Sequence, residues 1–113
     1  MVPITPETAR ATYLYLLSFP PFCKWKMPAA KALTFRVVAF TGEYASFDPD
    51  KMELQVSSAN IAKQQTLLKK IAHEMLHVHE HAINRWSKKH DTAFFFRCRD
   101  QVCKHFDFDP ADF

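Results

Sequence analysis

Glycine is almost absent from this sequence, with a single residue, Gly42, in a chain of 113. Globular proteins usually contain about 7% glycine. Neither the GxGxxG motif of dinucleotide-binding folds nor the GxxxxGK motif of phosphate-binding loops can be built from one glycine. Nucleotide-binding enzymes of these two classes are therefore excluded by composition.

Paired cysteines and long apolar runs are also missing. Cys23, Cys98 and Cys103 are an odd number of thiols and form no CxxC pair, which disfavours a disulfide scaffold or a zinc ribbon built from cysteine alone. No apolar run approaches the roughly 20 residues of a membrane span, and residues 1–7 lack the basic and apolar regions of a signal peptide. We expect a cytoplasmic protein with reduced thiols and no membrane association.

The overall composition is that of an ordinary globular protein, with 48% hydrophobic and 24% charged residues. The length predicts one domain over residues 1–113. A formal net charge of +3 permits contact with nucleic acid but does not require it, because nucleic-acid-binding proteins usually concentrate positive charge on one face.

Hydrophobic patterning predicts an α+β fold. A helix should begin at Thr5-Pro6 and end before Pro20, because threonine caps helices and proline suits their first turn. Three β-rich runs separated by short turns favour a small three-stranded antiparallel sheet. After them, a 3.6-residue hydrophobic period predicts a long helix. A final helix should follow, capped by Asp91 or Thr92. The expected strands are Leu33–Phe40, Tyr44–Phe47 and Met52–Ser57, and the long helix should run from about Asn60 to about Trp86. The final helix should turn Phe95, Cys98, Val102 and Phe106 inward.

Histidine is the residue type in excess, with 6 in the chain. Residues 73–77 follow the HExxH pattern within the predicted long helix. His73 and His77 lie one turn apart on the same helix face, so both imidazoles can reach one metal ion. Glu74 lies beside them, where it can hold a water molecule without being a ligand. The pattern predicts a catalytic metal site.

Catalytic zinc has three protein ligands and an open position, so a third ligand is required. Glu80 and His81 lie roughly 10 and 12 Å of helix rise beyond His73, too far to share its ion. His90 follows the end of the long helix, where the chain can fold back, and is the predicted third ligand. His105 is a weaker candidate.

Two further predictions concern the neighbouring positions. His79 falls near the centre of the apolar stripe, so we expect a core histidine bonded to a main-chain group. The metzincin pattern HExxHxxGxxH requires glycine and histidine where this chain has Glu80 and Ile83, so that class is excluded.

Residues 71–77 and 90–94 resemble the SprT-like zinc metallopeptidases, the family that includes Spartan. In that family HExxH is followed, after a helical stretch, by a histidine, usually a glycine, two variable residues and an aromatic residue. His90 and Phe94 match this pattern, and Asp91 replaces the glycine. Softer similarity extends over residues 9–106, without the CxxC pairs of a C-terminal zinc ribbon. The resemblance implies a zincin-like fold, a protein or peptide substrate, and a link to proteins associated with DNA.

The residues and the resemblance predict the same mechanism. Zn²⁺ held by His73, His77 and His90 lowers the pKa of a water molecule towards about 7. Glu74 accepts the water proton, the oxygen attacks a peptide carbonyl, and Glu74 passes the proton to the leaving amine. A second donor to the oxyanion is not assigned; the candidates are Tyr44, His81 and Arg85.

Two alternatives remain open from the sequence. One is a non-catalytic, zinc-containing binding module for nucleic acid or a protein partner, in which Lys24, Lys26, Lys31 and Trp25 form a basic, aromatic contact surface. The other is a metal-free helical protein in which the histidine spacing has no function. A structural zinc site would require four protein ligands, whereas a catalytic site has three.

Overall fold

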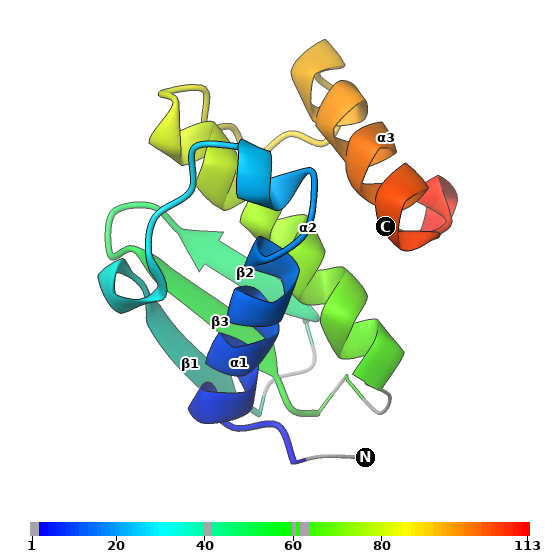
Figure 1. Ribbon diagram of the computed structural model, residues 1–113. Coiled ribbons are helices and arrows are strands. Elements are labelled where there is room, and N and C mark those ends of the chain that lie inside the picture. The colour runs from blue at the N-terminus through cyan, green and yellow to red at the C-terminus, as the bar shows by residue number, and fades with distance from the viewer. Residues whose placement is uncertain (1–2, 40–41, 60, 62–63) are drawn as a thin grey trace.

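The computed structural model describes residues 3–39, 42–59, 61 and 64–113. It is an α+β fold, as predicted, in three layers (Figure 1). Helices α1 and α2 cover one face of a three-stranded sheet, and α3 lies on the far side of α2. In chain order the elements are α1 (Pro6–Leu17), η1 (Phe22–Lys24), η2 (Ala30–Ala32), β1 (Thr34–Val38), β2 (Ala45–Asp48), β3 (Glu53–Ser57), α2 (Gln64–Ala82), α3 (Ala93–Phe106) and η3 (Pro110–Asp112).

The predicted start of α1 is confirmed. The Thr5 hydroxyl accepts a hydrogen bond from the Thr8 amide at 3.1 Å, and the Thr8 hydroxyl accepts one from the Thr5 amide at 2.8 Å. Pro6 occupies the first turn, where no intrahelical N–H is needed. The helix ends at Leu17, before Pro20 as expected.

The sheet is mixed, so the prediction of an antiparallel sheet was wrong. Its order is β1-β3-β2, with β1 parallel to β3 and β2 antiparallel to β3. Strand β3 lies at the centre of the sheet, and its Leu54 and Val56 are fully buried. The segment between Val38 and Ala45 is six residues long. An extended segment of this length can span about 20 Å. Two strands on either side of a third lie roughly 9.6 Å apart, so the connection is long enough to cross β3. Alternation along each strand does not reveal which strand is central.

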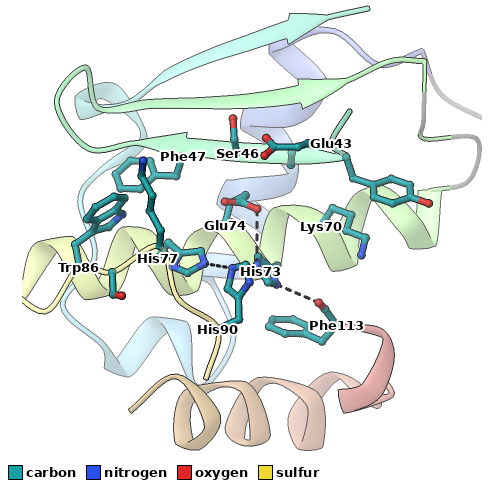
Figure 2. A pocket seen from close by; sticks show the side chains of 14 residues that line it. Glu43, Ser46, Phe47, Lys70, His73, Glu74, His77, Trp86, His90 and Phe113 are labelled. Carbon is teal, nitrogen blue, oxygen red and sulfur yellow. Dashed lines mark hydrogen bonds and ion pairs between the residues drawn. The ribbon is translucent and has the colours of Figure 1, made fainter. Parts of the chain in front are cut away.

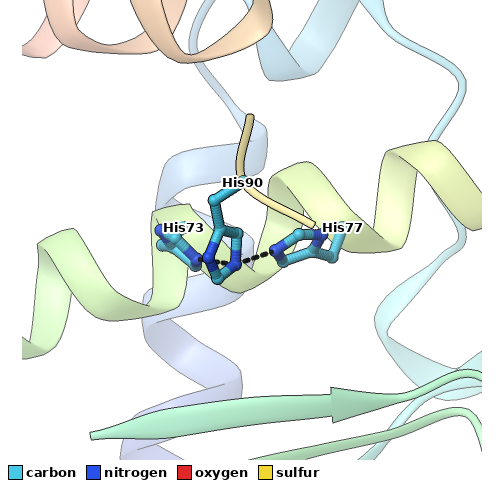
Figure 3. Close-up of side chains that lie close together, drawn as sticks. All are labelled: His73, His77 and His90. Carbon is cyan, nitrogen blue, oxygen red and sulfur yellow. Dashed lines mark hydrogen bonds between the residues drawn. The ribbon is translucent and has the colours of Figure 1, made fainter. Parts of the chain in front are cut away.

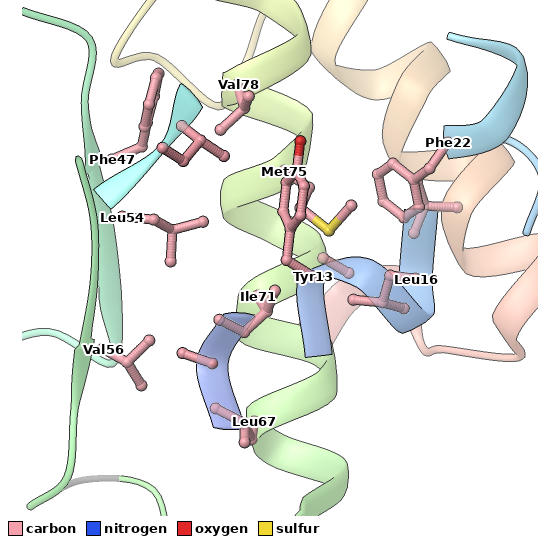
Figure 4. Close-up of a cluster of buried hydrophobic side chains, with 14 of the residues drawn as sticks. Tyr13, Leu16, Phe22, Phe47, Leu54, Val56, Leu67, Ile71, Met75 and Val78 are labelled. Carbon is pink, nitrogen blue, oxygen red and sulfur yellow. The ribbon is translucent and has the colours of Figure 1, made fainter. Parts of the chain in front are cut away.

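The main core lies between the sheet and the inner face of α2 (Figure 4). Leu54 and Val56 of β3 face Ile71 and Val78 of α2, while Tyr13 of α1 closes one side. The Tyr13 hydroxyl donates a hydrogen bond to the main-chain oxygen of Pro28. This packing fixes the position of α2 against the sheet.

Helix α2 ends at Ala82, four residues before the predicted end at Trp86. Asn84 adopts a left-handed conformation with φ 59°, and the Arg85 amide bonds back to the Glu80 main-chain oxygen at 2.6 Å. This is a Schellman motif, in which asparagine tolerates the left-handed position. The chain reverses there and returns past α2. The predicted ends at Phe40 and Asn60 lie outside the described residues.

Helix α3 begins at the second of the two predicted caps. The Thr92 hydroxyl accepts from the Phe95 amide at 3.0 Å. The predicted inward residues Phe95, Cys98 and Val102 are buried, and Phe106 is half-buried. Asp107, with φ 59°, ends the helix, and η3 then carries Phe113 back to the side of α2.

Candidate metal centre

A cavity of about 480 Å³ opens between α2 and the edge of the sheet (Figure 2). Its floor is the face of α2 that carries His73, Glu74 and His77. Strand β2 with the two residues before it forms one wall, and the segment after the Schellman motif forms another. The lining residues are Glu43, Tyr44, Ala45, Ser46, Phe47, Lys70, His73, Glu74, His77, Trp86, Ser87, Lys88, His90 and Phe113.

Three predicted ligands come together in this cavity (Figure 3). The Nε2 atom of His90 lies 3.0 Å from Nε2 of His77 and 3.3 Å from Nε2 of His73. His73 and His77 are one turn apart on α2, and His90 reaches them because the chain reverses after Asn84. The three side chains lie close enough together to bind one metal ion.

Outer hydrogen bonds determine which nitrogens of the two helical histidines carry protons. Nδ1 of His77 lies 2.6 Å from a carboxylate oxygen of Glu80, and Nδ1 of His73 lies 3.1 Å from the main-chain oxygen of Phe113. An ionised carboxylate and a main-chain oxygen only accept hydrogen bonds. Both Nδ1 atoms must therefore donate, so in the neutral form of each ring the Nε2 lone pair points towards His90. His90 can donate a proton to at most one of them, whereas a cation satisfies all three.

The electrostatic environment of His73 and His90 favours their neutral form. Burial, together with the neighbouring His77 and His90, lowers the pKa of His73 to about 3. Desolvation also lowers the pKa of His90, with His77 as the second cause. Neutral imidazole is the form that binds metal ions, so the cluster is prepared for a cation rather than for protons.

Glu74 is the only carboxylate on the α2 part of the cavity floor, judged over the residues that the structure describes. It is 8% exposed, and its Oε2 lies 4.0 Å from Nε2 of His73. Burial is the main cause that raises the pKa of Glu74, to about 7 once the opposing effect of His77, the further rise from Glu43 and the opposing effect of Lys70 are included. The carboxyl group is thus placed beside the histidine cluster but is not a member of it.

Three groups around the cluster do not follow from the HExxH pattern. Glu80 is too far along the helix to be a direct ligand, and the structure places its carboxylate behind His77. Phe113 provides the acceptor behind His73, and Lys70 lines the cavity one turn before Glu74. The i,i+3 spacing of His77 and Glu80 was the available signal for the first of these.

The remaining histidines lie elsewhere. His79 is a core histidine, as predicted: its Nδ1 lies 2.9 Å from the main-chain oxygen of Lys26, and its ring stacks on Trp25. His81 packs against Phe47, and His105, the weaker candidate for third ligand, contacts aromatic rings at the end of α3. Neither joins the cluster.

Of the three candidate oxyanion donors, only Tyr44 lines the cavity. Its ring also lies under the Lys70 ammonium, at 4.8 Å from the centroid. Arg85 lies over the Phe94 ring, 5.2 Å from its centroid, and His81 is likewise outside the lining. Its position therefore keeps Tyr44 as a candidate donor to the oxyanion, whereas the positions of His81 and Arg85 do not support such a role.

The basic, aromatic segment forms part of a second hollow, near the other end of α3. Lys24 and Trp25 line it together with Lys104 and His105 of α3, whereas Lys26 and Lys31 do not. The Trp25 ring is stacked on His79 at 4.5 Å, with an interplanar angle of 16°. One face of the indole is thus already covered within the protein.

Comparisons of the chain with protein-family models, with curated proteins and with solved structures returned no match. Among the described helices, none combines the length and apolarity needed to cross a bilayer.

Proposed function

We propose that the protein is a zinc-dependent metallopeptidase. The observation that carries this proposal is the pairing of three converging histidine nitrogens with the buried carboxylate of Glu74, 4.0 Å from one of them. Within the described part of the chain, no fourth histidine, cysteine or carboxylate joins the cluster. Three ligands and an open position are typical of catalytic zinc, whereas structural zinc has four.

Zinc suits the three nitrogens in both spacing and chemistry. With Zn–N distances of 2.0–2.1 Å, two ligands of a tetrahedral site lie about 3.3 Å apart. The separations from His90 are 3.0 and 3.3 Å, and all three ligand atoms lie within 4.8 Å of one another. Imidazole is a preferred zinc ligand, and the lowered pKa of His73 keeps that ring unprotonated.

A zinc ion held by His73, His77 and His90 would polarise a substrate carbonyl and acidify a water molecule. The chain's own contribution is proton transfer by Glu74. Its raised pKa, about 7, allows the carboxylate to accept a proton from water and to return it to the leaving amine. Burial beside the cluster keeps the carboxylate close to the reacting groups.

The shape of the cavity supports a peptide as the substrate. Strand β2 lines one wall and pairs only with β3 within the described sheet, so its other edge has no strand partner. An extended peptide can bind to such an edge through main-chain hydrogen bonds. Strand β2 and α2 lie on either side of the cavity, with Glu74 between them (Figure 2).

The resemblance of residues 71–77 and 90–94 to the SprT-like peptidases points in the same direction. It is also the basis for expecting DNA-associated proteins as substrates. The alternative of a zinc-containing binding module draws on the second hollow beside Lys24 and Lys104, but three ligands rather than four favour catalysis.

The decisive experiment compares Glu74→Gln with the wild type. Zinc content should remain at one ion per chain, because Glu74 is not a ligand, while kcat/KM for a quenched fluorescent peptide library should fall about 10²–10⁴-fold. Glu53→Gln is the matched control, a similarly buried carboxylate outside the cavity, and should retain activity. Normal cleavage by Glu74→Gln would refute the assignment.

A further inference from the structure

Glu80 is a buried carboxylate with no place in the chemistry proposed above. It is 1% exposed, yet its carboxylate forms no ion pair with a lysine or arginine within the described chain. A buried charge is costly unless it is paired and hydrogen-bonded. Its partner is His77, whose Nδ1 lies 2.6 Å from Oε1 of Glu80.

The contact between Glu80 and His77 is rigid on both sides. The two residues are one turn apart on α2, and the main-chain oxygen of Glu80 accepts from the Arg85 amide in the motif that ends the helix. The His77 ring is covered by Phe95, with ring centroids 5.6 Å apart. The imidazole therefore has little freedom to rotate or to exchange its two nitrogens.

The orientation of His77 follows from this contact. The carboxylate accepts, so the ring proton is held on Nδ1, and Nε2 presents its lone pair towards His90 at 3.0 Å. Nδ1 of His73 faces the main-chain oxygen of Phe113 instead, at 3.1 Å. Of these two outer contacts, the one at His77 is with a carboxylate side chain.

We propose that Glu80 is a positioning residue that holds His77 in its metal-binding tautomer and strengthens it as a ligand through its negative charge. This inference rests on the metal site of the proposed function. Carboxylates behind metal-bound histidines fix the tautomer and raise the basicity of the ligand, and their loss typically lowers metal affinity 10–100-fold.

The test uses the full chain and two variants, Glu80→Gln and Glu80→Ala. Zinc affinity is measured by competition with a chromophoric chelator. Glu80→Ala should weaken binding about 10–100-fold. Glu80→Gln keeps an oxygen acceptor of nearly the same size without the charge, and should lose less. Glu53→Gln, a buried carboxylate outside the cavity, is the control and should bind as the wild type does.

A second measurement reports on the tautomer alone. Imidazole ¹⁵N shifts of the metal-free proteins should show His77 protonated at Nδ1 in the wild type and a mixture of tautomers in Glu80→Ala. A role in packing alone would lower stability without changing these shifts. Wild-type affinity in both Glu80 variants, or an unchanged His77 tautomer in Glu80→Ala, would overturn the inference. Absence of zinc binding by the wild type would instead contradict the proposed function, and the tautomer measurement would still test Glu80.

Discussion

His77 and His79 are two residues apart on α2 and lie in different regions of the molecule. Both are buried, at 5% and 7% exposure. Both have Nδ1 within hydrogen-bonding distance of an acceptor, Glu80 in one case and the Lys26 main-chain oxygen in the other. They differ in what the rest of the ring contacts. Nε2 of His77 faces His90, whereas the His79 ring lies flat against Trp25.

The comparison shows which property distinguishes a candidate ligand from a core histidine. Burial and one hydrogen bond are common to both rings, so neither identifies a metal site. A step of two residues rotates the side chain by about 200° around the helix. His77 therefore faces the cavity, and His79 faces the connector around Trp25 and Lys26.

The largest expected difference between the two residues is in metal binding. His77→Ala removes a ligand, so zinc affinity should fall at least about 100-fold, more than for loss of an outer partner. His79→Ala should change it less than threefold. Competition with a chromophoric chelator measures both.

Thermal melting provides an independent check of that difference. Metal binding stabilises the folded state by about 4 kcal/mol when free metal is 1,000 times Kd. A strong chelator should therefore lower the Tm of the wild type and of His79→Ala, and leave that of His77→Ala unchanged. Equal loss of zinc binding in the two variants would contradict the distinction between them.

An intermediate effect is expected on stability. His79→Ala removes the hydrogen bond to the Lys26 oxygen and the stack on Trp25, and should lower the free energy of unfolding by about 1–3 kcal/mol. Urea denaturation of the metal-free protein measures this. His79→Phe keeps an aromatic ring against Trp25 and should recover part of the loss. A His79→Ala protein as stable as the wild type would show that this contact is not structural.

The smallest effects are expected at the two histidines outside both regions. His81 packs on Phe47 and His105 is exposed on α3. Alanine at either position should change stability by no more than about 0.5 kcal/mol and zinc affinity by less than twofold. If His81→Ala lost zinc as His77→Ala does, the choice of ligands would be wrong.

Local signals predicted most of the elements. The Thr5-Pro6 start of α1 and the Thr92 start of α3 depend on contacts within one turn, so the residue types suffice. The end of α2 was placed too late because Ile83 and Trp86 continue the apolar period, while the reversal depends on the backbone of Asn84. The sheet order was also missed, since three alternating strands are compatible with more than one order.

The sequence by itself determined the relation among His73, Glu74 and His77, because helical geometry relates residues one and four positions apart wherever the helix lies. It also placed His79 on the opposite, core-facing side. Only the tertiary structure decided that His90 lies 3.0 Å from His77, that Glu80 pairs with His77, and that Phe113 bonds His73. The contacts of His90 and Phe113 depend on where the chain reverses and on what packs over α2. The pairing of Glu80 with His77 depends on the burial and the rotamer of the Glu80 side chain. Helical spacing specifies none of these.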